Sequence, residues 1–288
     1  SILMELITEI DEKIYNVHNR NNKLLEKKFI NDILRRFGIR ATVKNLAIWQ
    51  KAFVHKSYSI NRKKRFKNED FSLPEDDYDY IPLQKESSEC LEWLGDGIIQ
   101  SVTAQYLWKR YPKQDEGFLT KTRSKLVRTD ALARLARYLK LQQFILLSTY
   151  MEEESNGRDN PKVLEDAFEA FIGAMVEDVG RDEFEGYKVC YEFIIKIFER
   201  VIDFSELIKR DDNYKDKLMR YCHQRFKGLN PSYENIDITL DGRNKIYTEI
   251  VRDIEDSDNI IGKASGRSKK EAQQAAAKMA LEYYKNNE

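Results

Sequence analysis

The stretch ECLEWLGDG at residues 89–97 opens a long apolar segment that carries acids but no bases. Over residues 90–108 the only charged side chains are those of Glu92 and Asp96. With Glu89 just upstream, these acids fall on one face of a helix, three and seven residues from its start. A single acid on a helix is most often only a solvated group, so this pattern alone does not define a site.

A second apolar segment, residues 163–180, repeats the pattern. Its charged residues are five acids with no Lys or Arg among them: Glu165, Asp166, Glu169, Glu177 and Asp178. Burying carboxylates on two such helices requires compensating positive charge. Oxygen ligands, in a chain with only three histidines, favour a hard divalent cation such as Mg²⁺ over zinc. A site of this kind suits phosphodiester hydrolysis, in which a metal activates water and a neighbouring metal stabilises the leaving oxygen.

Composition sets broad limits on the class of protein. The chain has 288 residues, enough for about two domains, and its 49 basic and 49 acidic residues give no net charge. A nucleic-acid partner must therefore be argued from local clusters of charge. No apolar run approaches the ~18 residues of a membrane span. The three cysteines have no pairable spacing, which favours a reducing, intracellular location, cytoplasmic or nuclear.

The hydrophobic spacing predicts a multidomain chain. Residues 1–45 show two runs of helical periodicity, either helices that pack on the main body or a dimerisation arm, with Gly38 as a stop. Residues 46–205 are expected to form an all-α domain. Within it, residues near 60–86 are first basic and then acidic with two prolines, which predicts an exposed insert. The basic run of the insert is either a solvated loop or a phosphate contact.

Residues 211–288 differ from the rest. A helix is expected at about 213–226, followed by three strand-like segments and an Ala-rich helix with Ser268 as its N-cap. Helix, three strands and helix make an α+β (αβββα) module.

Four colinear stretches resemble the ribonuclease III family. ECLEWLGDG resembles the signature E-x-L-E-[FW]-L-G-D-[AGS], and AFVHKSY at 52–58 resembles A-[LF]-x-H-x-S-Y. DEGFLTKTRSKLV at 115–127 resembles E-G-x-L-[ST]-x-x-R-[SA]-x-L-V, and LEDAFEAFIGAMVEDVG at 164–180 resembles the second acidic helix of the family. The C-terminal GRSKKEAQQAAAKMAL resembles the last helix of a double-stranded-RNA-binding domain. Together the resemblance covers roughly residues 46–286.

The resemblance implies roles for individual residues. Four carboxylates match the metal ligands of the family: Glu92, Asp96, Asp166 and Glu169. Glu89 and Glu116 match two further acids near the same valley, and Lys162 matches a lysine that eukaryotic members place near the scissile phosphate. The implied cofactor is Mg²⁺, with Mn²⁺ expected to substitute, and no small-molecule cofactor is expected. Single-domain members act as homodimers, whose two sites leave 5′-phosphates and two-nucleotide 3′ overhangs.

The C-terminal module is expected to bind double-stranded RNA. Duplex RNA is read through its phosphates and 2′-hydroxyls, and lysines at a helix N-terminus suit phosphate. The expected contacts are Lys269, Lys270, Lys263, Arg267, Arg243 and Lys245. Departures from the family put minor-groove contacts in doubt: Gln273 stands where a third lysine is usual, and Met219 and Arg220 replace a common Gln-Glu pair.

The expected function is a Mg²⁺-dependent endoribonuclease that cleaves double-stranded RNA. One nuclease domain behind a helical extension is similar to budding-yeast Dicers, and next to the yeast enzymes that process ribosomal RNA. The segment beginning Pro161-Lys162 favours the Dicer side, and hence production of small interfering RNA. The alternatives are a stem-loop processor for ribosomal or small nuclear RNA, and a scaffold that binds duplex RNA without cutting it.

Overall fold

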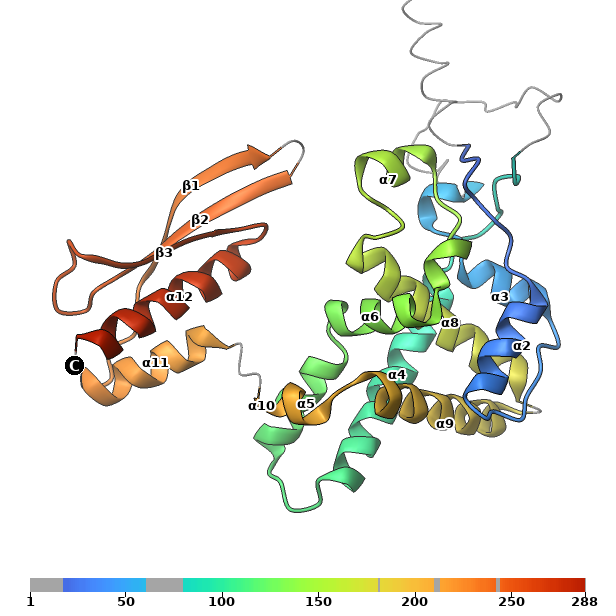
Figure 1. Cartoon of the computed structure of the whole chain (residues 1–288), viewed down its shortest axis with the longest axis horizontal. Coiled ribbons are helices and arrows are strands. Elements are labelled where there is room, and N and C mark those ends of the chain that lie inside the picture. Colours follow the sequence, from blue (N-terminus) through green and yellow to red (C-terminus); the bar gives the residue numbers. More distant parts are fainter. Residues whose placement is uncertain (1–17, 61–79, 181, 210–212, 242–243, 288) are drawn as a thin grey trace, which may run out of the picture. The chain divides into compact units, whose positions relative to one another are not determined.

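The computed structural model describes residues 18–60, 80–180, 182–209, 213–241 and 244–287. These residues form two compact units, divided between Leu207 and Ile208 (Figure 1). The first is helical and the second is an α+β module, as the sequence predicts.

The helical unit consists of short and long α-helices. Their bounds are α2 Lys27–Arg36, α3 Leu46–Ala52, α4 Glu89–Arg110, α5 Glu116–Leu126, α6 Thr129–Leu139, α7 Thr149–Glu154, α8 Pro161–Val179, α9 Glu183–Val201 and α10 Phe204–Lys209, the last of which crosses the division. Two 3₁₀ turns, η1 Lys56–Tyr58 and η3 Leu141–Phe144, complete it. No described helix is long and apolar enough to cross a membrane.

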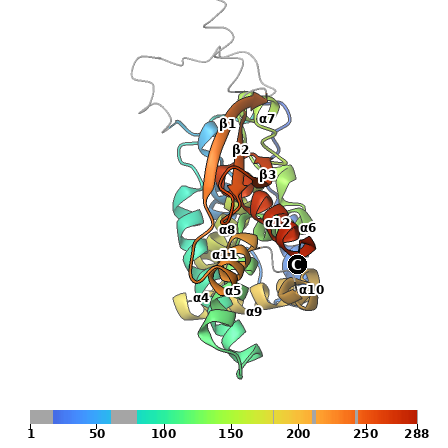
Figure 2. The same cartoon turned by 90° about the vertical axis from the view of Figure 1, so that its left-hand side faces the viewer.

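Helix α8 forms the centre of this unit. Asn160 caps its first turn by accepting from the backbone N–H of Lys162, and Pro161 stands at the start, where its missing N–H costs nothing. The helix packs against α3, α4, α6 and α9 (Figures 1 and 2). It is surrounded because its apolar residues lie on all sides, which is typical of a core helix.

The N-terminal prediction holds only in part. Residues 1–17 lie outside the described residues, residues 18–26 are not helical, and the second periodic run forms α2. Gly38, with φ of +64°, follows the helix end as predicted. Buried side chains of this region, such as Leu25 and Leu34, belong to the main core, so its described part packs on the body of the domain.

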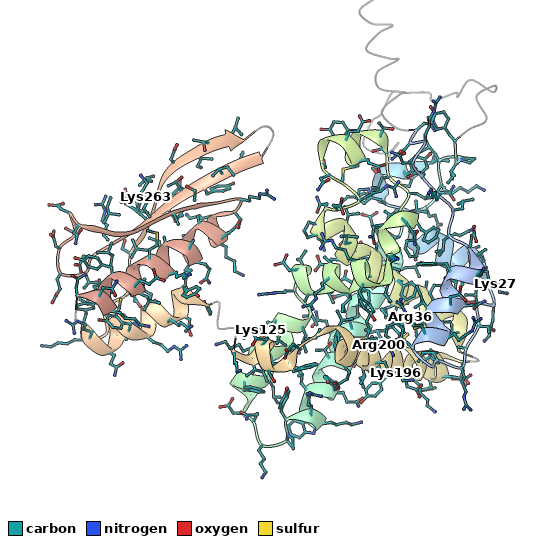
Figure 3. All side chains as sticks on the ribbon, viewed as in Figure 1. Lys27, Arg36, Lys125, Lys196, Arg200 and Lys263 are labelled. Carbon is teal, nitrogen blue, oxygen red and sulfur yellow. The ribbon has the colours of Figure 1, made fainter. Side chains whose placement is uncertain are left out.

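Helix α9 holds the end of α2. Arg200 Nη1 donates to the carbonyl oxygen of Arg36 at 3.1 Å, and Lys196 Nζ donates to that of Gly38 at 3.3 Å (Figure 3). Cations at a helix C-terminus satisfy carbonyls that have no partner within the helix. These basic side chains of α9 therefore have a structural role in joining the N-terminal region to the core.

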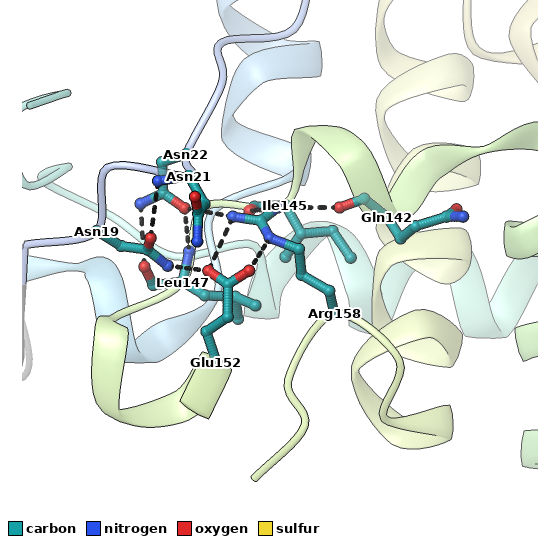
Figure 4. Close-up of polar contacts among 8 residues, drawn as sticks. All are labelled: Asn19, Asn21, Asn22, Gln142, Ile145, Leu147, Glu152 and Arg158. Carbon is teal, nitrogen blue, oxygen red and sulfur yellow. Dashed lines mark hydrogen bonds and ion pairs between the residues drawn. The ribbon is translucent and has the colours of Figure 1, made fainter. Parts of the chain in front are cut away.

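The segment before α2 is fixed by Arg158 (Figure 4). The guanidinium donates to Asn22 Oδ1 at 2.9 Å and to Glu152 Oε1 at 2.5 Å. Asn22 in turn exchanges two 3.0 Å hydrogen bonds with the backbone of Leu147, and Asn19 donates to Glu152. This network ties the start of the described chain to α7 and to the loop that leads into α8.

The C-terminal end of the predicted insert contacts the helical unit. Residues 61–79 lie outside the described residues, but residues 80–86 are held in place. The Tyr58 hydroxyl donates to the carbonyl oxygen of Ile81 at 2.6 Å, and Gln84 pairs with Ser59 in an isolated parallel bridge. A buried tyrosine with a satisfied hydroxyl anchors this strand-like return, a tertiary contact that composition does not reveal.

The second unit has the predicted αβββα order. Its elements are α11 Tyr214–Arg225, β1 Tyr233–Asp241, β2 Asn244–Arg252, β3 Ile260–Gly266 and α12 Lys269–Asn286. The strands form an antiparallel sheet in the order β1-β2-β3. Helix α12 packs on β2 and β3, and α11 packs on α12, so one small core lies between the helices and the sheet (Figure 1).

Candidate metal centre and nucleic-acid interface

Two glycines bring α4 and α8 into backbone contact. A Cβ atom on Gly95 would lie 1.8 Å from the carbonyl oxygen of Glu169, and one on Gly173 would lie 2.1 Å from that of Leu91. Any side chain at either position would force the helices apart. The close approach places the acids of α4 directly beside those of α8.

Three of the predicted ligands meet at this crossing. Glu92 from α4, together with Asp166 and Glu169 from α8, offers carboxylate oxygens that all lie within 4.8 Å of one another. Glu169 is only 6% exposed, and Glu92 and Asp166 are half-buried. We call Glu92, Asp166 and Glu169 the carboxylate group.

Burial and mutual repulsion destabilise the charged forms of these acids. Burial, followed by the charges of Glu165 and Asp96, raises the pKa of Glu169 from its ordinary value to about 8. Burial and the charge of Asp166 likewise raise the pKa of Glu92. A cation bound among these carboxylates would offset the repulsion and favour their charged forms.

Lys162 is the cation nearest to the carboxylate group. Its Nζ lies 2.8 Å from Asp166 Oδ1 and 3.0 Å from Glu165 Oε2, although neither oxygen has a donor in good hydrogen-bonding geometry. Burial acts to lower the pKa of Lys162, but its contacts with Asp166 and Glu165 outweigh burial and raise it. Lys162 therefore stays charged beside the carboxylate group.

The other predicted acids lie outside this group. Asp96, one turn further along α4, accepts from Gln100 Nε2 at 3.1 Å, and its charge still acts on Glu169. Glu89 is exposed and accepts from Ser87 Oγ at 2.8 Å. Glu116 is also exposed, at the start of α5, and accepts from Thr120 Oγ1 at 2.8 Å.

Glu165 is a site residue to which sequence reasoning assigned no role. The residue is only 8% exposed, and its side chain shares Lys162 with Asp166. One signal was available in the sequence, because Glu165 lies three residues after the only lysine at the start of the apolar segment.

The first turn of α12 carries the predicted phosphate contacts. Lys269 and Lys270 are exposed there, and the Ser268 hydroxyl accepts from the N–H of Glu271 at 3.2 Å. The carboxylate of Glu271 in turn accepts from the N–H of Arg267, the residue before the N-cap, at 2.9 Å, so both contacts close the helix end. Two lysines and the positive end of the helix dipole then act at one place.

The remaining predicted RNA contacts are dispersed. Lys263 of β3 is exposed (Figure 3), and it follows Gly262, whose missing Cβ would meet Ala276 of α12. Alternation along a strand therefore directs Lys263 to the face of the sheet away from α12. Lys245 is exposed at the start of β2, and Arg243 lies outside the described residues.

The missing third lysine of α12 has a spatial counterpart on α11. Lys215 Nζ donates to Gln273 Oε1 at 2.6 Å, and Gln273 Nε2 donates to Glu249 Oε2 at 2.8 Å. Glu249 is completely buried. A cation from α11 thus reaches the end of the Gln273 side chain, a contact between distant segments that the motif does not reveal.

Comparisons with known proteins agree with both units. The family model "Ribonuclease III domain" matches residues 89–180, and "Double-stranded RNA binding motif" matches residues 214–284. Ribonuclease 3 of Sulfurovum sp. is 37% identical over 199 residues, covering 69% of this chain and 84% of that protein. Ribonuclease 3 of Streptococcus gordonii is 31% identical over 268 residues, covering 89% of this chain and 97% of that protein.

A longer relative matches as well. The probable ribonuclease 3 of Acanthamoeba polyphaga mimivirus is 30% identical over 283 residues, which cover 97% of this chain but only 50% of that protein. The carboxylate group at the crossing of α4 and α8, the lysine-bearing N-terminus of α12 and these matches lead to one conclusion. The chain belongs to the ribonuclease III family and is a double-stranded-RNA-specific endoribonuclease.

Proposed function

We propose that this chain cleaves double-stranded RNA as a Mg²⁺-dependent homodimer and leaves 5′-phosphates with two-nucleotide 3′ overhangs. The observation that carries the proposal is the carboxylate group, whose three ligand oxygens lie within 4.8 Å of one another. Mn²⁺ is expected to substitute for Mg²⁺.

The residues fit a hard divalent cation. The ligand atoms are all carboxylate oxygens, the donors that Mg²⁺ prefers. Glu92, Asp166 and Glu169 would hold it, with Asp96 close enough to act on Glu169. Burial and the neighbouring acids raise the pKa of Glu169, so a bound cation would favour its charged form. When bound, such a cation supplies an activated water and stabilisation of the leaving oxygen.

The protein residues account for orientation and charge. Lys162 presents an ammonium group beside Asp166, where a phosphate oxygen would be attracted. Glu169 is buried, and its backbone carbonyl lies against Gly95 of α4. The lysines of α12 bind the duplex through its backbone and therefore without reading its sequence.

A homodimer is supported by Trp93. This tryptophan follows Glu92 on α4 and is 79% exposed. Aromatic side chains, tryptophan among them, are enriched in protein interfaces. Two copies that meet here would place two carboxylate groups on one duplex.

For the biological role, we favour Dicer-type production of small interfering RNA. This preference depends on the Pro161-Lys162 start of α8 and on the ion pair that Lys162 forms there. Processing of ribosomal or small nuclear RNA stem-loops is the alternative, and it predicts cleavage near a hairpin end.

The test is digestion of end-labelled and body-labelled long double-stranded RNA with Mg²⁺, followed by denaturing electrophoresis. Short products of uniform size are expected, and Asp166→Asn and Glu169→Gln should abolish cleavage while duplex binding in a mobility shift remains. Glu177→Gln, an exposed acid on the same helix, is the matched control. Cleavage of hairpins alone would favour the processing role, and intact RNA with retained binding would favour a scaffold.

A further inference from the structure

Glu165 is a nearly buried acid beside the carboxylate group but not part of it. Its side chain is 10% exposed, and its Oε2 lies 3.0 Å from Lys162 Nζ, one turn earlier on α8. A carboxylate at this depth requires a partner of opposite charge. The Lys162 ammonium is such a partner.

Lys162 lies between two carboxylates that have different roles. Its second partner, Asp166, lies 2.8 Å away and belongs to the carboxylate group. A divalent cation held by Asp166 would compete with Lys162 for the same carboxylate and repel its ammonium. Glu165 is not part of the carboxylate group, so it would remain available to pair with Lys162 when the divalent cation is bound.

Glu165 also has an unfavourable effect on the site. Its charge acts on Glu169 in the same direction as burial, against ionisation. An acid added beside the carboxylate group and Asp96 therefore increases the repulsion, unless its charge stabilises another group. The ion pair with Lys162 is the favourable contact that the geometry offers.

We propose that Glu165 is a positioning residue that holds the Lys162 ammonium beside the carboxylate group when a divalent cation occupies Glu92, Asp166 and Glu169. This inference rests on the proposed nuclease function, in which Lys162 attracts the RNA phosphate. Glu165 then acts through Lys162 and not as a metal ligand.

The test is a double-mutant cycle with Glu165→Gln, Lys162→Gln and the double variant, with Glu177→Gln as the matched control. In the metal-free protein, the double variant should lose less melting temperature than the sum of the single losses, because each substitution removes the other's partner. With saturating RNA and Mg²⁺, Glu165→Gln should lower the single-turnover cleavage rate by about tenfold, the size of effect found for residues that orient a metal site.

Two further readouts separate positioning from other roles. The Mg²⁺ concentration for half-maximal rate should not change in Glu165→Gln, and the same substitution should have no further effect on the rate in the Lys162→Gln background. Glu165→Asp, which keeps the charge with a shorter side chain, should retain part of the rate if the Gln variant folds poorly.

Three results would overturn the proposal. Additive losses in the cycle would show that the two residues act independently. If Glu165→Gln raised the Mg²⁺ concentration for half-maximal rate both with Lys162 present and in the Lys162→Gln protein, Glu165 would be a metal ligand. If Glu165→Gln left the cleavage rate unchanged, its contact with Lys162 would be only a structural ion pair. Failure of the parent protein to cleave RNA would reject the nuclease function instead, while the melting-temperature cycle would still report on the Glu165–Lys162 contact.

Discussion

Gly95 of α4 lies against the backbone of Glu169 of α8 so closely that a Cβ atom would be 1.8 Å from the Glu169 carbonyl oxygen. The contact has a counterpart at Gly173, whose Cβ would be 2.1 Å from the carbonyl oxygen of Leu91. The position of the carboxylate group therefore depends on two residues that contribute no side chain to it.

Substitution of either glycine by alanine should separate the helices. We expect Gly95→Ala and Gly173→Ala each to lower the free energy of unfolding by about 1–3 kcal/mol or more, as overpacking does. Both should also weaken Mg²⁺ binding, which isothermal titration can measure. The control is Gly97→Ala on the same helix, where the new methyl group meets nothing within 4 Å. That variant should be more stable by about 0.5–1 kcal/mol in urea unfolding.

The pKa of Glu169 predicts a pH dependence for the metal-free protein. This pKa is about 8 in the folded chain and 4.5 ordinarily, so the folded state favours the protonated acid. The contribution of protonated Glu169 to the free energy of unfolding is fully present below pH 4.5 and is lost as the pH rises through 8. Urea unfolding without metal should show this loss between pH 5 and 9, and Glu169→Gln should remove it. Equal slopes in the two proteins would contradict the burial of an ionisable Glu169.

Mg²⁺ binding should release a proton near neutral pH. At pH 7, Glu169 is mainly protonated before the cation binds, since its pKa is about 8. Calorimetry in two buffers of different ionisation enthalpy should detect the release, and the affinity should rise with pH up to about 8. Glu169→Gln should bind Mg²⁺ more weakly and release fewer protons.

Arg158 should be essential for stability. Its side chain is 17% exposed and its ion pair with Glu152 lies within a network that includes Asn22. Arg158→Met leaves Glu152 without its cation, and loss of one partner of a buried pair costs about 3–5 kcal/mol. Thermal and urea unfolding measure the loss, with the exposed neighbour Glu153→Gln as control. A loss no larger than that of the control would mean that solvent replaces the network.

Each of the two lysines in the first turn of α12 should contribute one phosphate contact. Lys269→Gln and Lys270→Gln should each weaken duplex binding at all sequences and reduce the slope of log affinity against log salt by about one. Lys285→Gln, exposed in the last turn of the same helix, should leave the slope unchanged. If Lys269→Gln and Lys270→Gln gave the same salt slope as Lys285→Gln, the phosphate contacts would lie elsewhere in the module.

Sequence alone predicted the type of each unit and the helices that carry the acids. Periodicity, caps such as Ser268 and the Gly38 stop are local signals, and they correctly indicated a helical domain followed by an αβββα module. The acids of α4 and α8 were also identifiable, since each lies in a long apolar segment without bases, residues 90–108 and 163–180. The boundary of the insert was less predictable because it depends on the contact between Tyr58 and Ile81.

Only the tertiary structure decided which side chains meet. Helical spacing on α4 put Glu89, Glu92 and Asp96 on one face, yet Glu92 alone of these joins Asp166 and Glu169 within 4.8 Å. The contact of Lys215 with Gln273, between segments far apart in the chain, was equally hidden. The physical reason is that spacing sets directions within one helix, whereas the point at which two helices cross depends on where their backbones can touch, here at Gly95 and Gly173.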